Sequence, residues 1–353
     1  MKIIYIGFKY DYGDPKRGFS YEHYNFYDSL CRMDNGGHKI VYFPFDEIMQ
    51  RVGALQMNEL LIETALREKP DLCFFFIVND EIRKETIDKI TQKGILTFNW
   101  FADDQWRFDS FSKHYAPYFS WVGTTDSKAP EKYHKIGYTN VIKTQWACNH
   151  FLYKPINSEE KYGITFVGQP HGNRKKILEK VKIGAGVDIE CWGRGWPKGR
   201  VSQEKMIDIF SNSDINLNLT ENSHGPILKS IAKVFLAKNS NGLSFVSPVY
   251  WSDNVKMLLI RRRKQMKGRM FEVPGCGGFL VTGDADNLLD YYEDGKEIVV
   301  YKDMKDLIAK VGYYKDHPNE RNRISLAGYK RTLREHTYEQ RLRKVFKVMG
   351  LLA

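Results

Sequence analysis

One stretch of the chain reads Lys267-Gly-Arg-Met-Phe-Glu-Val-Pro-Gly-Cys-Gly-Gly-Phe279 and continues as Leu280-Val-Thr282. It combines a helix-like segment, a glycine turn and a short apolar run that is typical of a buried strand. Arg269 lies one helical turn before Glu272, and the glycines would let the backbone approach an anionic phosphate closely. A carboxylate nearby can accept hydrogen bonds from sugar hydroxyls. The stretch therefore suits a nucleotide with a ribose and a diphosphate, although a glycine-capped helix before a core strand is the alternative interpretation.

Strand-like and helix-like segments alternate on both sides of this stretch. In the first half we expect helices over 20–33, around 60–66 and over 81–93, and strands at 2–7, 39–43, 72–78, 95–99, 119–123 and 141–145. In the second half we expect helices from 173, at 203–211, 303–315 and at the C-terminus, and strands at 164–168, 187–192, 215–219, 279–282 and 298–301. Such alternation is typical of parallel, doubly wound sheets.

The polar segment 154–161 divides the two series, so we expect two α/β domains facing each other across a cleft. Their predicted bounds are 1–153 for the first domain and 162–336 for the second. The last helix, 337–353, carries an apolar seam that needs a partner surface, and we expect it to pack back on the first domain. The segment 220–266 does not fit the alternation and is predicted to be inserted around the cleft.

Composition indicates a globular protein with an affinity for anions. Of 353 residues 42% are hydrophobic, and the net charge is +11 with an isoelectric point near 9.2. This charge favours sugar nucleotides, anionic polymers or membrane surfaces as partners. The basic run 261–267 next to the glycine stretch fits a phosphate site or, alternatively, a solvated helix face.

Other classes of site have no support in the sequence. The five cysteines are scattered singly and the nine histidines show no spacing with them that would hold a metal, so we predict neither disulfides nor a metal site. We also predict no signal peptide and no membrane span, and expect a soluble, cytoplasmic protein.

The second half resembles the CgeB-like, spore-coat type of glycosyltransferase, a branch of the GT-B superfamily. The resemblance covers roughly residues 162–346 and is carried by six pieces in order: Phe166-Val-Gly168 with Arg174, Cys191-Trp-Gly-Arg-Gly-Trp196, Ser213-Asp-Ile-Asn-Leu-Asn218, the glycine stretch, Glu293-Asp-Gly-Lys-Glu297 and Gly328-Tyr-Lys-Arg-Thr-Leu-Arg-Glu-His-Thr-Tyr338. It implies the GT-B fold of two Rossmann-like domains. It also implies transfer of a sugar from a nucleotide-diphosphate donor, for which we expect uridine or guanosine, with neither metal nor any other cofactor.

The resemblance also implies roles for single residues. Glu272 would hold the donor ribose, Gly277 and Gly278 would supply backbone contacts, and Arg174 and Arg269 would compensate the diphosphate. Further donor-side candidates are Gly168, Gly193, Arg194, Asn218 and His224. Many retaining relatives carry a second glutamate at the position that is Lys264 here; we nevertheless favour a retaining outcome.

Candidates for the acceptor side follow predicted strands of the first half. Asp103 or Asp104 could take a proton from an incoming hydroxyl or orient a sugar, with helix capping as the alternative. Trp100 and Trp106 offer flat faces for a sugar ring. Tyr10, Asp11 and His23 are additional contributors in the region after the first strand, His23 as a catalytic candidate.

Three other functions remain open from the sequence. They are a sugar-nucleotide epimerase on the same fold, a non-catalytic sugar-binding scaffold, and a nucleic-acid-binding protein that uses the basic surface. The acceptor of a transferase is equally open: a glycan, a protein or another hydroxyl compound, with nucleic acid not excluded.

Overall fold

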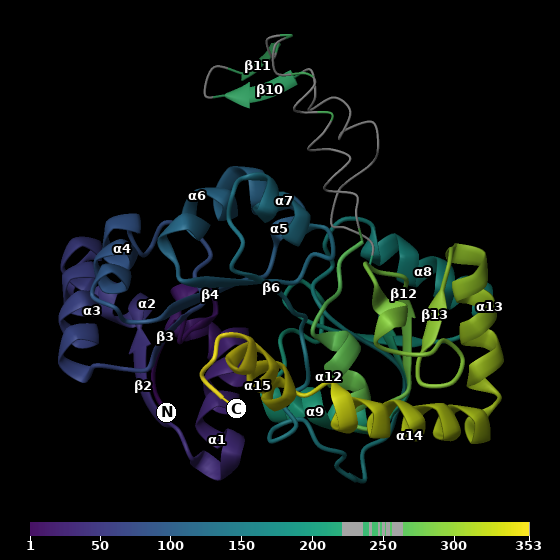
Figure 1. Cartoon of the computed structure of the whole chain (residues 1–353). Coiled ribbons are helices and arrows are strands. Elements are labelled where there is room, and N and C mark those ends of the chain that lie inside the picture. The colour runs from purple at the N-terminus through teal and green to yellow at the C-terminus, as the bar shows by residue number, and fades with distance from the viewer. Residues whose placement is uncertain are drawn as a thin grey trace. The chain divides into compact units, whose positions relative to one another are not determined.

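The computed structural model describes residues 1–220, 236–239, 242–245, 248, 251, 255 and 264–352. The chain divides into two compact units (Figure 1). The first consists of Met1–Leu152 together with the chain from His336 onwards, and the second is Tyr153–Glu335.

The described part of the first unit contains a parallel sheet of six strands in the order β2-β1-β3-β4-β5-β6. The strands are β1 (Lys2–Gly7), β2 (Lys39–Pro44), β3 (Leu72–Phe75), β4 (Thr97–Phe101), β5 (Trp121–Thr124) and β6 (Val141–Lys143). The helices are a π-helical turn (His23–Tyr27) leading into α1 (Asp28–Gly36), then α2 (Phe45–Val52), α3 (Ala54–Glu68), α4 (Lys84–Gln92), α5 (Asp104–Arg107), a second π-helical turn (Phe108–Ser112), α6 (Lys113–Tyr115), α7 (Ala129–Lys135) and α15 (Tyr338–Val348). Short 3-10 turns lie at Asp11–Gly13, Pro15–Arg17 and Ala116–Tyr118.

Alternation of side chains along β1 divides the core of this unit into two layers. Ile4 and Ile6 point into a cluster with the inner faces of α2, α3, α4 and α7. Ile3 and Tyr5 point the other way, into a cluster with α1 and α15. Successive strand residues face opposite sides of a sheet, so a strand that is apolar at nearly every position must be covered on both.

The C-terminal helix completes the second of these layers. A capping box at Thr337 starts α15, which buries Leu342, Val345 and Phe346 in the same cluster as Ile3 and Tyr5. The chain thus returns from the second unit to supply part of the first unit's core.

The described part of the second unit contains a parallel sheet in the order β13-β12-β9-β7-β8. Its strands are β7 (Tyr162–Val167), β8 (Ile189–Trp192), β9 (Ser213–Asn218), β12 (Leu280–Gly283) and β13 (Val299–Tyr301), and a separate antiparallel pair consists of β10 (Leu236–Asn239) and β11 (Gly242–Phe245). Its helices are α8 (Arg174–Ala185), α9 (Gln203–Asn212), α12 (Arg269–Gly275), a 3-10 turn (Leu288–Asp290), α13 (Met304–Lys315) and α14 (Pro318–Glu335).

The two faces of this second sheet differ in polarity. One face packs apolar side chains such as Phe166, Leu217 and Val281 against α8 and α13. The other carries buried polar residues that bond to each other and to α9: Thr165 donates to Asn216 Oδ1 (3.2 Å), and the Asn216 amide donates to the Phe210 carbonyl (3.1 Å). Buried polar groups of this kind are tolerated because they are paired.

The predicted fold class of two doubly wound parallel sheets is confirmed, with strand ends displaced by a few residues. The predicted strand 72–78 ends at Phe75, because the chain turns away at the edge of the sheet. The sequence analysis did not predict α14; Pro318 ends the preceding helix and also begins this one, where its missing N–H costs nothing. Most of the predicted insertion 220–266 lies outside the described residues.

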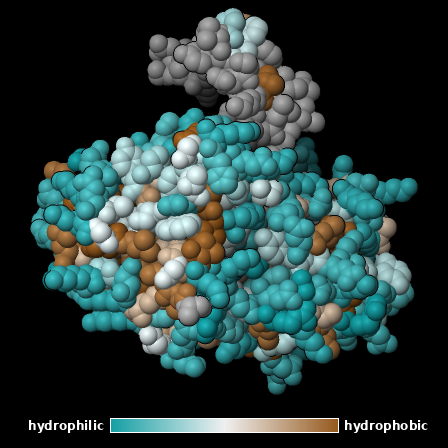
Figure 2. Space-filling model, in the orientation of Figure 1, coloured by the Kyte–Doolittle hydropathy of each residue, from teal (hydrophilic) through white to brown (hydrophobic). Residues whose placement is uncertain are grey.

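Charged and polar residues cover most of the face shown in Figure 2. Within the described ranges, none of the helices combines the length and the apolar composition that crossing a bilayer requires.

Gly278 is predicted to be essential for packing of the second unit. A Cβ there would collide with the Phe210 carbonyl oxygen and lie 2.9 Å from Asn216 Nδ2. We expect Gly278→Ala to lower the free energy of unfolding by about 1–3 kcal/mol, as overpacking does. Thermal unfolding measures this, with Gly163→Ala as the matched control because a Cβ at Gly163 meets nothing within 4 Å. Equal stability of both variants would contradict the packing role.

Candidate functional site

Two loops of the second unit meet at the carboxyl ends of β7 and β8. Gly168 donates its N–H to the Trp192 carbonyl (2.8 Å), and its own carbonyl accepts from Trp196 Nε1 (2.7 Å). Gly193 has φ +135°, and a Cβ there would lie 2.5 Å from the Gly168 oxygen. Gly168 and Gly193 therefore lie where two backbone segments approach each other closely. The strand order reverses between β7 and β9, which is where open α/β sheets bind ligands.

Arg174 begins α8 beside this edge. Its guanidinium donates to the Gln169 carbonyl (2.8 Å) and lies 5.8 Å from the centre of the Phe166 ring. This anchoring orders the side chain next to Gly168, as a phosphate-binding arginine requires. Arg194, another donor-side candidate, is exposed on the loop after β8.

The helix α12 brings a second cationic group and a buried carboxylate together. Lys267, just before α12, donates to the Leu219 carbonyl (2.9 Å), so this end of the helix lies at the carboxyl end of β9. Arg269 forms an ion pair with Glu272 through Oε2, and Glu272 is fully buried. The other carboxylate oxygen, Oε1, is buried without a hydrogen-bond donor among the described residues. A buried acceptor left unsatisfied costs about 1–3 kcal/mol, so its retention calls for an explanation.

The remaining donor-side candidates have structural roles or lie elsewhere. Gly277 and Gly278 precede β12, at the sheet edge opposite to the one that carries Gly168, and close packing accounts for Gly278. The Asn218 amide donates to Thr282 Oγ1 (2.9 Å), an interaction between neighbouring strands. His224 lies outside the described residues.

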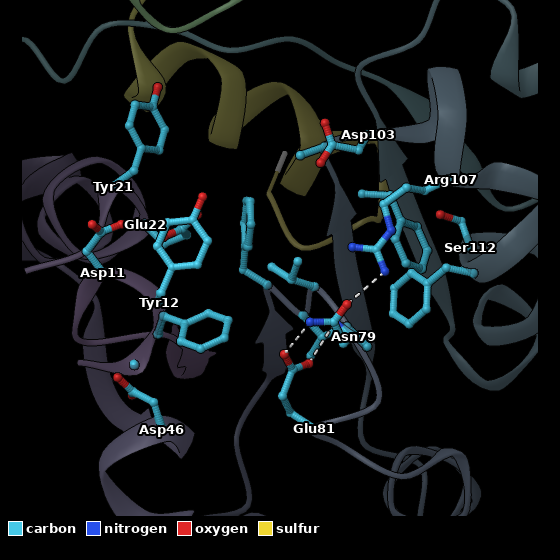
Figure 3. Close-up of a pocket in the computed structure, with 18 of the residues that line it drawn as sticks. Asp11, Tyr12, Tyr21, Glu22, Asp46, Asn79, Glu81, Asp103, Arg107 and Ser112 are labelled. Carbon is cyan, nitrogen blue, oxygen red and sulfur yellow. Dashed lines mark hydrogen bonds between the residues drawn. The ribbon is translucent and has the colours of Figure 1, made fainter. Parts of the chain in front are cut away.

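The first unit contains a pocket of about 600 Å³ at the carboxyl ends of β1, β3 and β4. Strand order reverses between β1 and β3, so this pocket also occupies the switch point of its sheet. Figure 3 shows Asp11, Tyr12, Tyr21 and Glu22 on one side, and Asp103, Arg107 and Asn79 on the other. Its walls are lined with apolar and aromatic side chains: Phe8, Tyr12, Tyr21, Met49, Phe76, Ile77, Val78, Phe101, Ala102, Phe111 and Trp146.

Two carboxylates of this pocket, Glu22 and Asp103, hold their protons more tightly than usual. Burial raises the pKa of Glu22 to about 7, and the nearby carboxylates of Asp11 and Asp103 add to the increase. Burial also raises the pKa of Asp103, against the opposing charge of Arg107. A carboxylate that titrates near neutral pH can accept a proton or a hydrogen bond from a substrate hydroxyl.

The pocket separates the predicted acceptor-side residues into two groups. Asp11 and Asp103 line it. Asp104 does not: it is fully buried, accepts a hydrogen bond from the Tyr133 hydroxyl (2.9 Å), and burial raises its pKa to about 6. His23 lies outside the pocket lining as well, half-buried and stacked on Phe19 with ring centres 4.3 Å apart.

One of the two proposed tryptophan platforms, Trp100, needs correction. Trp100 is fully buried in the core, against Phe26. Its ring cannot contact a sugar, because Trp100 lies within β4 and the surrounding core side chains cover the ring. Trp106 and Tyr10 are not in the pocket wall, whereas Trp146, on the segment after β6, is.

Sequence analysis missed Glu22 and Tyr12, which both line the pocket. Glu22 sits two residues after Ser20, whose side chain accepts from the His23 N–H (2.9 Å) at the start of a helix. The predicted start of a helix at residue 20 therefore carried a signal, because the first turn of a helix after β1 faces the carboxyl edge of the sheet. Tyr12 has φ +54°, a backbone conformation that the sequence did not reveal.

Within the described residues, no three His, Cys, Asp or Glu side chains lie so as to hold a metal ion. All five cysteines lie in the described ranges and none of them forms a disulfide; Cys73, Cys148 and Cys276 are buried.

Two comparisons with known proteins concern the amino-acid sequence. A family described as glycosyl transferase-like matches residues 245–347. The spore protein CgeB of Bacillus subtilis (strain 168) is 22% identical over 350 residues, which is 96% of each chain.

Solved structures share the fold of this chain. The Anabaena protein Alr3699/HepE in complex with UDP superposes with a TM-score of 0.58 at 10% identity over all of both chains. A glycosyltransferase from Rickettsia africae ESF-5 gives a TM-score of 0.59 at 8% identity, over 98% of this chain and 97% of the other. At identities of 8–10%, the similarity to these structures shows a shared fold and no more.

Glu22→Gln is expected to change how stability depends on pH. Between the ordinary pKa of a glutamate and about 7, the unfolded chain ionises while folded Glu22 keeps its proton, so wild-type stability falls as pH rises through this window. The variant lacks this loss, and we expect its advantage in unfolding free energy to grow by about 1–3 kcal/mol between pH 5 and pH 8.

Thermal or urea unfolding at several pH values measures the difference. Glu59→Gln, at an exposed position of α3, is the control and should show no such trend. A pH-independent difference for Glu22→Gln would show that its pKa is not raised.

Proposed function

We propose that the chain is a CgeB-like glycosyltransferase of the GT-B type, whose second unit binds a nucleotide-diphosphate sugar and whose first unit binds the acceptor. The sugar would pass to a hydroxyl group of the acceptor. The UDP complex of the HepE relative supports a uridine nucleotide for this chain, with guanosine as the other expectation.

The observation that carries the donor site is the unsatisfied oxygen of Glu272. Glu272 Oε1 is buried and has no donor among the described residues, while Oε2 is held by Arg269. A ribose offers two neighbouring hydroxyls, each able to donate to a carboxylate. We propose that a ribose hydroxyl supplies the missing partner.

The leaving group would be stabilised by the cations at the same edge. The bond between the anomeric carbon and the diphosphate breaks, and its electron pair leaves with the diphosphate, while the acceptor oxygen bonds to that carbon and loses its proton. Negative charge therefore builds on the diphosphate, and fixed guanidinium groups stabilise it. Arg269 and Arg174 suit this role because a guanidinium can bond phosphate oxygens in a bidentate manner.

Metal independence and the stereochemical outcome belong to the same proposal. The two arginines would replace the divalent cation that other transferases use on the diphosphate. We expect the transferred sugar to keep its anomeric configuration, as the sequence resemblance implied, although Lys264 stands where many retaining relatives carry a carboxylate.

Glu272→Gln is predicted to weaken binding of the nucleotide sugar about 10- to 100-fold. A hydrogen bond to a charged acceptor contributes roughly 1.5–3 kcal/mol, and the neutral amide cannot replace it. Equilibrium titration with UDP- and GDP-sugars measures the effect, and Glu293→Gln, exposed and paired with Lys296 in the same unit, is the control. An unchanged dissociation constant in folded Glu272→Gln would remove Glu272 from the donor site.

Arg269→Ala is expected to lower turnover more than donor affinity. The guanidinium acts on charge that develops only as the diphosphate departs, so the loss should appear mainly in kcat. A variant in which only KM rises would place Arg269 in ground-state binding.

Release of free nucleotide should continue in excess EDTA and should depend on an added acceptor. The first result is expected because arginines compensate the diphosphate, and the second because a transferase consumes the acceptor hydroxyl. NMR of the product should show the anomeric configuration of the donor. Loss of activity with EDTA, acceptor-independent conversion of the donor sugar, or an inverted product would each overturn the corresponding part of the proposal.

A further inference from the structure

The pocket of the first unit has a charge opposite to that of the chain as a whole. Five carboxylates line it, from Asp11, Glu22, Asp46, Glu81 and Asp103, against the single cation Arg107. The whole chain carries a net charge of +11. Such a local reversal selects the charge of whatever enters, because like charges at close quarters cost free energy.

Three of these carboxylates have partners that fix the walls of the pocket. Asp46 accepts from the N–H groups of Lys9 and Tyr10 (both 2.9 Å), which holds the loop after β1. Asp11 pairs with Arg17 (3.0 Å).

Glu81 completes the group of partnered carboxylates. It accepts from the backbone N–H of Asn79 (2.7 Å). These three groups are held by the protein. The other two carboxylates of the pocket are Glu22, hydrogen-bonded with Ser20, and Asp103, hydrogen-bonded with Trp106. A carboxylate has several lone pairs, so each of the two can still accept from a ligand hydroxyl.

The cation of the pocket is also committed. Arg107 donates to Asn79 Oδ1 (3.0 Å) and lies 4.6 Å from the centre of the Phe111 ring. A ligand carboxylate or phosphate would have to compete for Arg107 while facing Glu22 and Asp103. An uncharged polyhydroxylated ligand meets no such conflict, because its hydroxyls donate to both carboxylates.

The apolar wall fits the same class of ligand. Tyr12 lines the pocket beside Glu22 (Figure 3). Its side chain is 79% exposed, and the Arg17 guanidinium lies 4.2 Å from its ring centre. An exposed ring held in place by a cation presents a flat face to the C–H side of a sugar. The volume, about 600 Å³, lies within the range of small-ligand sites.

We propose that this pocket is the acceptor site and that it selects an uncharged sugar, with Glu22 and Asp103 accepting hydrogen bonds from its hydroxyls and Tyr12 covering its ring. This inference rests on the proposed transferase function. It disfavours nucleic acid and other phosphate-bearing chains as acceptors, an alternative that the sequence left open. The basic surface would then serve the donor or a non-substrate anion.

Binding should strengthen as pH rises through about 7, because an ionised carboxylate is the stronger acceptor and Glu22 titrates there. The charged groups that act on it are the carboxylates of Asp11 and Asp103, which disfavour its ionised form, whereas a hydrogen bond with the Ser20 side chain favours that form. The hydroxyls of Tyr5 and Tyr42 also lie near Glu22 and stay neutral in this pH range, because their pKa values are raised.

The test compares p-nitrophenyl glycosides of the common neutral hexoses with the matching uronides, by ligand-observed NMR on the full chain. We expect at least one neutral glycoside to bind about 10-fold more tightly than its uronide at pH 8. A short DNA or RNA duplex should not displace it. Equal or tighter binding of uronides, displacement by the duplex, or binding of no neutral glycoside would overturn the proposal.

Two variants keep the result specific to this pocket. Glu22→Gln should reduce neutral-glycoside affinity several-fold at pH 8 and abolish its pH dependence, and Glu59→Gln should not. Tyr12→Asn removes the ring at an exposed position while retaining a residue that tolerates positive φ, and should also weaken glycoside binding. Affinity for UDP- and GDP-sugars, measured on the same samples, should stay at the wild-type value. If the wild-type protein bound neither UDP-sugars nor GDP-sugars, that result would instead refute the proposed function.

Discussion

Parallel strands carry their carboxyl ends to one edge of a sheet, and both candidate sites of this protein depend on that constraint. In the first unit it brings the segments after β1, β3 and β4 around one pocket. In the second it brings Gly168, Gly193 and the start of α12 to the same edge of the sheet. The reversal of strand order next to β1 and next to β7 opens a space there, because the following connections run to opposite sides.

The two edges differ in charge, and this difference gives them different chemistry. Lys267, Arg269 and Arg174 lie at the edge of the second sheet, with Glu272 buried behind Arg269. The pocket of the first sheet is lined by five carboxylates, and burial raises the pKa of two of them, Glu22 and Asp103. Under the proposed function, the cations would stabilise the diphosphate of the donor, and the carboxylates would accept hydrogen bonds from the hydroxyls of the acceptor.

Glycines mark the places where the second unit allows no side chain. Gly193 lies against the Gly168 carbonyl, and Gly278 lies against the Phe210 carbonyl. The first contact shapes a loop at the carboxyl edge, whereas the second fixes α9 against the start of β12 at the opposite edge. Glycine thus has two roles in this unit, one in shaping a loop at the carboxyl edge and one in close packing at the opposite edge. Which role a glycine has depends on the edge of the sheet at which it lies.

Sequence by itself determined the fold class, since alternating strand-like and helix-like runs with strands apolar at nearly every position allow few arrangements other than doubly wound parallel sheets. It also determined the pairing of Arg269 with Glu272, because residues three apart on a helix are neighbours. Tertiary structure decided which residues reach a pocket. Asp103 and Asp104 are adjacent in sequence, but one lines the cavity and the other bonds Tyr133 in the interior. Glu22 owes its raised pKa first to burial and then to the carboxylates of Asp11 and Asp103, and a local sequence pattern records neither cause. Charge and burial at a site are properties of neighbours that only the folded chain brings together.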